Sequence, residues 1–290
     1  MAYDFIQQKH INAGQMWRQT FVDTVNKAVT AVPTQRRPHT FISSKPGLGK
    51  SYTTQYLLDT NNINYVPISG HPSLWNFTVQ LAEVVYLLPA GQTAIIWVDD
   101  CDKIFTGETN CNVLKNMLEG HKTLAYNVDV SNNISKIRNS GNTYLADLLE
   151  TFKGKNGLGL NIDCKNLVFI FTSNIFLPDA DRVTAAEGKK EYNQIVGQHA
   201  LRDRCRTKDL IMEWQDHWGW IADVCINDDV LNGIFGKKDS QAEEIILKFM
   251  WDKWPNLKEK SVRTAEKMAE DYMDYPDSYE NHWIATYVKI

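Results

Sequence analysis

The sequence predicts an α/β protein: a mostly parallel sheet with helices on both faces, followed by a small all-helical unit. Two patterns lead to this prediction. Short apolar runs alternate with helical stretches from about residue 40 onwards, and the strand signals stop after about residue 214. The length of 290 residues allows one large domain or two modest ones. With 43% hydrophobic and 23% charged residues, the composition excludes a chain that is disordered throughout.

Four apolar runs are the predicted strands, because continuous short runs are typical of strands buried on both faces. They cover residues 40–44, 64–69, 93–99 and 167–172. Helical patterns fall between them, notably over 73–88 and 112–119. We therefore expect an α/β domain over residues 36–214 in which the strands run parallel.

Helical patterns also stand at both ends of the chain. Residues 1–35 form an N-terminal segment in which Trp17, Phe21 and Val25 recur at about helical spacing. Three helices are expected over 216–231, 240–254 and 260–273, which makes a helical unit of 215–273. The tail, 274–290, is aromatic and acidic and shows no clear period.

Charge and cysteine usage narrow the class of protein. The net charge of −4 argues against a protein that simply coats nucleic acid. It does not exclude a local basic patch. The runs at 84–88 and 93–98 are far too short to span a bilayer, and the first ten residues lack the pattern of a secretory signal. The five cysteines include no C-x-x-C pair, so we expect reduced thiols in a cytoplasmic protein.

A phosphate-binding loop is predicted directly after the first strand. The pattern G-x-x-x-x-G-K-[ST] matches from Ser44, which stands where a glycine is usual, to Ser51. Two glycines allow the backbone N–H groups to surround a phosphate, and the helix that follows points its positive end at it. The predicted ATP-binding residues are Ser44, Lys45, Pro46, Gly47, Leu48, Gly49, Lys50, Ser51 and Tyr52. Lys50 would reach the β- and γ-phosphates, and Ser51 would coordinate Mg²⁺.

The third strand, TAIIWVDD, ends in two carboxylates. In a parallel sheet they emerge at the carboxyl edge, beside a phosphate loop that follows another strand. Asp99 is the expected Mg²⁺ ligand, and Asp100 is expected to orient or deprotonate the attacking water. Asp102 is a third carboxylate, with a helix cap as its alternative role.

The segments after the fourth strand supply further candidates. Asn174 would lie between the phosphate loop and Asp100 if its strand lies between theirs, with a simple turn residue as the alternative. Arg202, Arg204 and Arg206 cannot share one helix face, so we expect at least one to point away and to serve a neighbour's γ-phosphate, with surface salt bridges as the alternative. Arg263 stands in the first turn of a helix, where an anionic ligand would explain it.

Taken in order, these segments resemble the AAA+ family of P-loop ATPases over about residues 36–273. SKPGLGKS is similar to its Walker A motif, IIWVDD to Walker B, and FTSN to the sensor 1 strand. LRDRCR resembles the arginine-finger segment, with Arg204 in the finger position of clamp loaders, and SVRTAE resembles sensor 2, with Arg263 touching nucleotide. Ser44 in place of glycine and Asp100 in place of glutamate depart from the pattern.

The resemblance implies a five-stranded sheet in the order 5-1-4-3-2, a C-terminal helical lid, and ring or spiral homo-oligomers, with a hexamer expected. The compact size is similar to that of clamp loaders and helicase loaders of phage or bacterial replication. DNA or a DNA-bound replication protein is then the expected partner, with no membrane, in a bacterial cell or a phage-infected host. The alternatives are a protein-remodelling, unfoldase-like ATPase and a scaffold that binds ATP but hydrolyses it slowly.

An insertion is predicted at about 121–164, because the connection between Asp100 and the fourth strand is longer than one helix needs. It resembles the pre-sensor 1 hairpin of AAA+ helicases; a long solvent loop is the alternative. Its basic and aromatic residues are candidates for DNA contacts: Lys136, Arg138, Lys153, Lys155, Tyr126 and Tyr144. Trp75 lies about 100° from the apolar stripe of its helix, so it either meets substrate or packs beneath the insertion.

Overall fold

The computed structural model describes residues 8–70, 72–119, 123–126, 130–154, 159–184, 189–228 and 230–289. The chain forms two compact units. The sheet unit comprises Val25–Ser44 and Tyr56–Asp209, and the helical unit comprises Met1–Thr24, Lys45–Gln55 and Leu210–Ile290. Apart from Ser44, the predicted phosphate-loop residues thus belong to the helical unit, while the strands of the main sheet, apart from Leu210, belong to the sheet unit.

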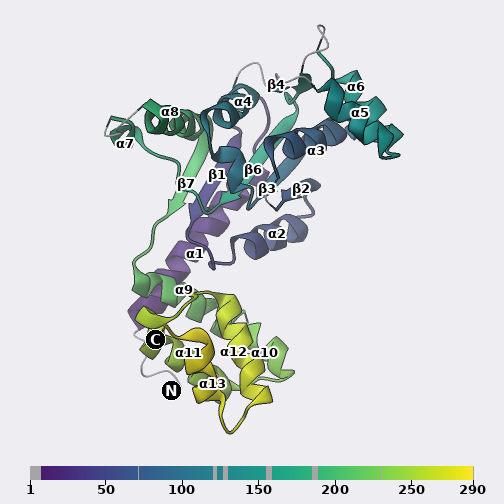
Figure 1. The fold of residues 1–290 in the computed structure, drawn as a ribbon. Coiled ribbons are helices and arrows are strands. Elements are labelled where there is room, and N and C mark those ends of the chain that lie inside the picture. Colours follow the sequence, from purple (N-terminus) through teal and green to yellow (C-terminus); the bar gives the residue numbers. More distant parts are fainter. Residues whose placement is uncertain are drawn as a thin grey trace. The chain divides into compact units, whose positions relative to one another are not determined.

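The sheet unit contains a five-stranded sheet in the order β2-β3-β6-β1-β7 (Figure 1). These strands are β1 (His39–Ser44), β2 (Tyr65–Ser69), β3 (Ala94–Asp99), β6 (Leu167–Ser173) and β7 (Cys205–Leu210). The pairs β1/β6, β3/β6 and β2/β3 are parallel. The four predicted strands are confirmed, and the strand order is the one that the resemblance implies. The fifth strand, β7, falls within the arginine segment, where the sequence showed no apolar run.

Side chains of the central strands alternate between two cores. Ile96, Val98 and Phe171 face a core shared with α3 (Leu74–Leu87) and α4 (Glu108–Leu118), while Trp97 and Ile170 face a second core. The second core includes the last turns of α1 (Gln8–Val29) and α2 (Lys50–Thr60). Burial on both faces explains why β1, β3 and β6 read as continuous apolar runs rather than alternating ones.

The strand β2 differs from this prediction, because it is not buried on both faces. Only Ile68 of its five residues is fully buried, since β2 is the first strand of the sheet and lacks a second neighbour. Pro67, which cannot donate a backbone hydrogen bond, is typical of such an edge strand.

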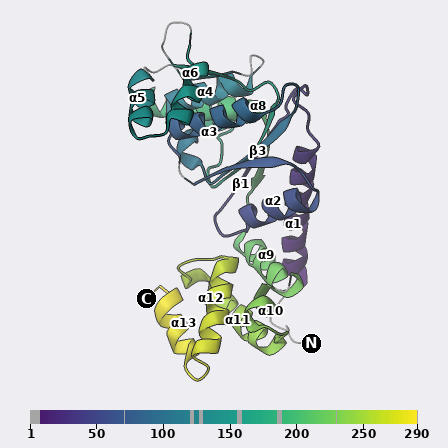
Figure 2. The same cartoon turned by 90° about the vertical axis from the view of Figure 1, so that its right-hand side faces the viewer.

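The described part of the insertion is folded, so the alternative of a long solvent loop is wrong. Strands β4 (Thr123–Tyr126) and β5 (Leu160–Asp163) pair antiparallel, and the helices α5 (Ser131–Asn139) and α6 (Thr143–Thr151) lie between them in the chain. The helix α6 lies beside α3, as Figures 1 and 2 show. Apolar side chains of all four elements join the core of the sheet unit, because each has a buried face.

Trp75 is not free to meet a substrate. Its ring centroid lies 5.5 Å from that of Tyr126, and both side chains pack against the core of the sheet unit. Of the two alternatives for Trp75, packing beneath the insertion is therefore the correct one. The sheet unit also contains the short helix α7 (Ala180–Thr184) and the longer helix α8 (Lys189–Arg204).

The helical unit contains α9 (Trp214–Asn227), α10 (Val230–Phe235), α11 (Ser240–Lys253), α12 (Val262–Asp274) and α13 (Tyr279–Tyr287). The three expected helices are present, and the first of them is divided into α9 and α10. The aromatic tail, in which no clear hydrophobic period is visible, forms α13, and its Trp283 is fully buried against Phe249 and Tyr279. The first part of α1 also belongs to this unit.

Two glycines allow α1 and α9 to cross closely. A Cβ atom on Gly14 would lie 2.3 Å from the backbone nitrogen of Trp220, and one on Gly219 would lie 2.0 Å from the carbonyl oxygen of His10. Real side chains do not approach backbone atoms this closely. The N-terminal helix is therefore an integral part of the helical unit.

Ion pairs reinforce the same contact. Arg18 of α1 donates from Nη1 to Asp223 of α9 over 3.1 Å and also pairs with Asp228. Gln15 and Asn227 donate to the other oxygen of Asp223 over 2.8 and 2.6 Å, and that side chain is only 4% exposed.

We expect Arg18→Met to lower the free energy of unfolding of the helical unit by about 3 kcal/mol, because it leaves a buried carboxylate without its cation. Urea unfolding followed by tryptophan fluorescence measures this loss. The double variant Arg18→Met/Asp223→Asn should regain part of it, because the uncompensated charge is removed. An unchanged midpoint for Arg18→Met would show that the pair contributes nothing.

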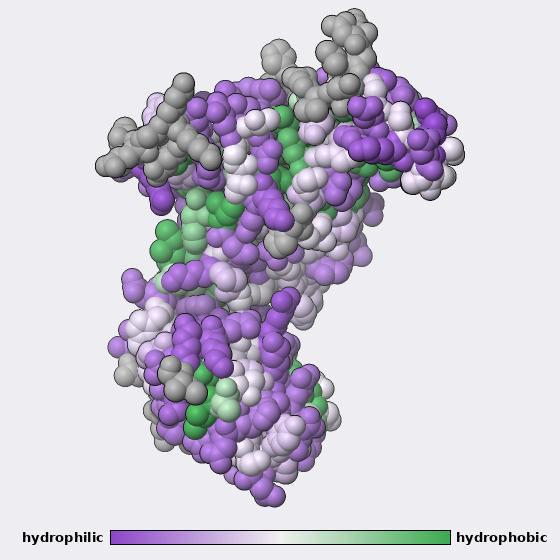
Figure 3. Space-filling model, in the orientation of Figure 1, coloured by the Kyte–Doolittle hydropathy of each residue, from purple (hydrophilic) through white to green (hydrophobic). Residues whose placement is uncertain are grey.

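Hydrophilic side chains predominate on the face drawn in Figure 3, and hydrophobic ones show there only in small groups. Among the helices of the described residues, none is long and apolar enough to cross a membrane.

Candidate functional site

The phosphate loop has the backbone that its sequence predicts. Gly47 and Gly49 have φ angles of 90° and 67°, which only glycine adopts readily. The helix α2 begins at Lys50, and its first turn contains no acidic side chain that would offset its positive end. This combination of a left-handed loop and a helix start without acidic side chains is suited to an anion.

Lys50 is the cation of this loop. It is only 6% exposed, and its Nζ donates to the backbone carbonyl of Lys45 over 3.3 Å. Lysines are rarely buried unless they meet a negative charge. The loop thus holds a buried cation where the sequence expects the phosphates of ATP. Ser51 follows in the first turn of α2 and is half-buried, whereas Tyr52 is 66% exposed.

The start of α12 touches this loop. A Cβ atom on Gly47 would lie 2.7 Å from Cβ of Ser261 and 2.8 Å from the carbonyl oxygen of Lys260. Ser261 caps α12, because its side chain accepts a hydrogen bond from the backbone N–H of Thr264 over 3.1 Å. Arg263, the second residue of α12, is exposed. The structure thus brings the helix start that carries Arg263 to the phosphate loop.

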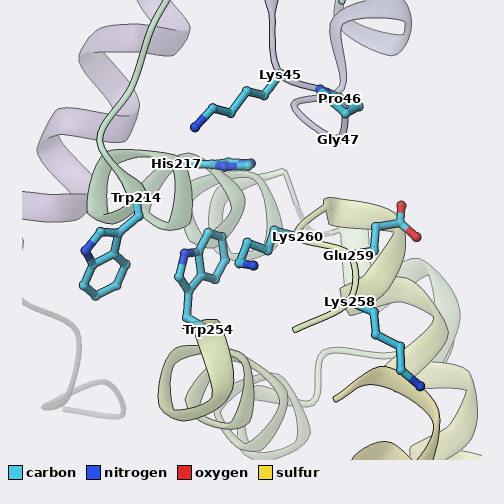
Figure 4. A pocket seen from close by; sticks show the side chains of 9 residues that line it. All are labelled: Lys45, Pro46, Gly47, Trp214, His217, Trp254, Lys258, Glu259 and Lys260. Carbon is cyan, nitrogen blue, oxygen red and sulfur yellow. The ribbon is translucent and has the colours of Figure 1, made fainter. Parts of the chain in front are cut away.

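A pocket of about 430 Å³ borders the same loop (Figure 4). It is lined by Lys45, Pro46, Gly47, Trp214, His217, Trp254, Lys258, Glu259 and Lys260. Figure 4 shows the aromatic rings gathered on one side, while the side chains of Lys258 and Glu259 point away from them. The imidazole of His217 meets the indole of Trp254 edge to face, with centroids 5.3 Å apart. Apart from the loop, nothing in the sequence pointed to this pocket.

His217 is a buried histidine in a basic environment. Burial, with Lys45 and Lys260 close by, lowers the pKa of its imidazole to about 4, against the effect of a hydrogen bond to the backbone of Lys260. Among the described residues, none gives Nε2 of this ring a hydrogen bond. The ring is therefore neutral at pH 7.

The lowered pKa makes the stability of the helical unit depend on pH. Below pH 6.5 the unfolded chain takes up a proton that folded His217 does not accept, so stability falls as the pH is lowered from about 6.5 to 4. The expected loss is about 3 kcal/mol. Urea midpoints across this range measure it. His217→Gln should show a flatter profile, whereas His282→Gln, which replaces a more exposed histidine of the same unit, should follow the wild type. Parallel profiles for His217→Gln and wild type would contradict the assignment.

In the sheet unit, the ends of β3 and β6 bring the predicted carboxylates and Asn174 together. Asp99 pairs with Thr172 in the register of the two strands, and its Oδ1 accepts a hydrogen bond from the hydroxyl of Thr172. The same hydroxyl accepts from the indole Nε1 of Trp97 over 3.0 Å. Asp99 is 8% exposed, so its carboxylate is held in one orientation at the sheet edge.

Asp100 has an unusual backbone. Its φ angle of 51° lies in the left-handed region, which aspartate enters more readily than most residues but which still costs energy. Its Oδ1 accepts a hydrogen bond from the side-chain amide of Asn174 over 3.2 Å. The strand β6 lies between β1 and β3, as the predicted position of Asn174 requires. The contact between Asp100 and Asn174 is therefore present.

Asp102 does not cap a helix, which corrects one predicted alternative. The turn that begins at Asp102 has no side-chain cap. Instead, Oδ1 of Asp102 accepts from the hydroxyl of Ser173 over 2.6 Å and from the backbone N–H of Asn174 over 3.3 Å. Sequence reasoning missed Thr172 and Ser173, although their place at the end of an apolar strand was visible.

The three arginines all have partners within the sheet unit. Arg202 binds Asp209 over 2.7 Å and the carbonyl of Leu177 over 2.8 Å. Arg204 pairs with Glu119 and donates to the carbonyl of Ala200, and its side chain is 19% exposed. Burial lowers the pKa of its guanidinium.

The helix α8 ends at Arg204, so Arg206 lies on β7 instead of on the helix. Arg206 is exposed, and its Nη2 donates to Gln35 over 2.8 Å. The inward orientation of Arg204 makes Arg206 the arginine that is more accessible to a neighbouring molecule.

The basic residues of the insertion are partly neutralised. Arg138 pairs with Asp147 over 2.8 Å and Lys153 with Glu150 over 3.3 Å, whereas Lys136 is exposed. Tyr144 is 55% exposed, but Tyr126 packs against Trp75. Lys155 lies outside the described residues. Among the described candidates, Lys136 and Tyr144 are exposed and have no ion pair or ring contact described above, while the prediction of DNA contacts stays a prediction.

A search with models of known protein families finds no match to this sequence, and a search of curated proteins finds no significant match.

Proposed function

We propose that this protein is a Mg²⁺-dependent ATPase of the AAA+ type that assembles with copies of itself and remodels a macromolecule. The observation that carries the proposal is the contact between Asp100 and Asn174 at the carboxyl edge of a sheet ordered β2-β3-β6-β1-β7. In such a sheet, ligands bind outside the carboxyl ends of the strands. The phosphate loop follows β1 directly in the chain.

The features of the phosphate loop support the proposal that the ligand is a triphosphate. Gly47 and Gly49 give the backbone the curvature that a phosphate requires, and Lys50 supplies a buried cation. The positive start of α2 adds to this attraction. The pocket beside Lys45–Gly47 supports a nucleotide over a simple phosphate, because Trp214, Trp254 and His217 suit a planar base.

The residues also fit Mg²⁺. In the described parts of the chain, no group of three or more His, Cys, Asp and Glu side chains could hold a metal ion. Mg²⁺ needs no such group, because it is usually held by one or two protein oxygens, phosphates and water. As the resemblance implies, Ser51 and Asp99 are the residues expected to hold the ion, which would neutralise charge on the phosphates.

Within this proposal, Asp100 is the base that orients the attacking water, and Asn174 fixes the side chain of Asp100. We expect Asp100→Asn to keep nucleotide binding and to lower ATP turnover about 10²-fold or more, because the shape is kept while the carboxylate is lost. Phosphate release and titration with a fluorescent ATP analogue measure the two quantities. Asp147→Asn, an exposed carboxylate of the insertion, is the matched control. Normal hydrolysis by Asp100→Asn would show that another residue is the base.

Two classes of macromolecule are candidates for the substrate that this ATPase remodels, namely DNA and protein. A DNA transaction of the helicase-loader or clamp-loader kind follows from the resemblance. The pairing of Arg138 and Lys153 with acidic residues removes part of the basic surface and favours the second candidate, a protein-remodelling ATPase. Stimulation of turnover by single-stranded DNA, measured over a salt series, separates them, because phosphate contacts weaken steeply with salt.

A further inference from the structure

We propose that Asp102 is a positioning residue for ATP hydrolysis, which holds Asn174 in the orientation that serves Asp100. The inference rests on the proposed function, because it concerns the same site. Asp102 itself lies two residues beyond the expected base and has no direct role in that proposal.

Hydrogen bonds connect the segment that follows β3 with the end of β6. Oδ1 of Asp102 accepts from the hydroxyl of Ser173 over 2.6 Å and from the backbone N–H of Asn174 over 3.3 Å. The hydroxyl of Ser173 accepts in turn from the N–H of Ile175 over 3.0 Å. One carboxylate oxygen thus binds the backbone of Asn174 directly and that of Ile175 through the hydroxyl of Ser173.

This fixed turn places the side chain of Asn174. Its amide nitrogen donates to Oδ1 of Asp100 over 3.2 Å. Asp100 is itself anchored, because its backbone N–H donates to the carbonyl of Thr172 over 3.1 Å. Asp102 and Asp100 therefore act on Asn174 from two directions, one through the backbone and one through the side chain.

Burial makes the arrangement rigid. Ser173 is fully buried, and Cys101 between the two aspartates is also fully buried. A charge-assisted hydrogen bond to a buried hydroxyl is stronger than a neutral one. The carboxylates of Asp100 and Asp102 repel each other, which favours their separation. The hydrogen-bond donors of Ser173 and Asn174 offset this repulsion and stabilise the orientation of Asp102 toward β6.

The test compares Asp102→Ala, Asp102→Asn and Ser173→Ala with wild type. For Asp102→Ala we expect kcat for ATP to fall about 10²-fold with an almost unchanged nucleotide Kd, because a small misplacement near reacting atoms costs about this much. Asp102→Asn should recover much of the rate, because its amide oxygen still accepts from Ser173. Ser173→Ala, which removes one donor and only one oxygen atom, should show a smaller loss.

A double-mutant cycle with Asn174→Ala distinguishes positioning from a general loss of structure. If Asp102 acts through Asn174, the loss in kcat for the double variant should not exceed that of Asn174→Ala alone. Amide hydrogen exchange at residues 173–175 should accelerate in Asp102→Ala while the rest of the sheet stays protected. Asp147→Ala should change neither readout.

The outcomes separate the two proposals. A wild-type protein that neither binds nor hydrolyses ATP would overturn both. Normal wild-type turnover together with an unchanged kcat in Asp102→Ala, or fully multiplicative losses in the cycle, would overturn the positioning role alone. If Asp102→Ala fails to fold, Ser173→Ala decides, since an unchanged kcat and unchanged exchange in that variant would count against the proposal.

Discussion

Lys50→Ala is expected to abolish both ATP binding and ATP turnover. The ammonium group of Lys50 lies in a loop with two left-handed glycines, and it is the charge that would hold the β- and γ-phosphates. Loss of a buried cation from a phosphate site removes a charge-assisted interaction that water cannot replace. Calorimetric titration with ATP and Mg²⁺ and a phosphate-release assay measure the two effects.

Lys248→Ala is the matched control for this variant. It removes a lysine with a half-exposed side chain from α11 in the same unit and should bind ATP as the wild type does. Melting of the nucleotide-free proteins identifies a loss that results from unfolding. A folded Lys50→Ala protein that binds ATP with unchanged affinity would exclude the loop as the phosphate site.

Arg206→Ala should bind ATP normally but hydrolyse it about 10³-fold more slowly, if an arginine from a neighbouring subunit completes the site. The structure favours Arg206 over Arg204 for this role, because Arg204 is held by Glu119 and the carbonyl of Ala200 while Arg206 is exposed. We expect Arg204→Ala to lower the melting temperature first, because it leaves Glu119 without its cation.

Mixed oligomers test whether the arginine acts in trans. Arg206→Ala subunits retain Lys50, and Lys50→Ala subunits retain Arg206, so mixing them should restore part of the activity. Each subunit of the mixture then supplies what its neighbour lacks. Absence of recovery in assemblies shown to contain both variants would contradict a trans role, and a larger turnover loss for Arg204→Ala would return the role to Arg204.

The sequence predicted the central strands well, because strands buried on both faces leave long apolar runs such as those of β3 and β6. It missed β7, because this strand carries a mixture of charged and apolar residues and has only two buried ends. No local pattern distinguishes such a strand from the end of the preceding helix. The contact that holds it in the sheet involves residues far away in the sequence.

Some residues of the candidate site could likewise be predicted from the sequence, and others could not. Lys50, Asp99 and Asp100 could be proposed from the sequence because the chemistry of a phosphate site requires certain residue types at fixed positions after a strand. The hydrogen bonds of Asp102 to Ser173 and Asn174 could not be predicted, because the sequence pattern of an aspartate after a strand is equally typical of a helix cap. Trp75 was ambiguous for a similar reason: helical phase shows which face it occupies but not that Tyr126 covers that face.

The close crossing of α1 and α9 at Gly14 and Gly219 also constrains the order in which the chain folds during synthesis. His10 leaves the ribosome more than 200 residues before Gly219, and the two must meet. At 5–20 residues per second, α1 waits about 10–40 s for its partner helix. The sheet unit is complete once Asp209 has emerged, ten residues before Gly219, whereas the helical unit still needs the helices that follow. The helical unit is assembled from three separate stretches, one of which contains residues 45–55, so we expect it to form after the sheet unit.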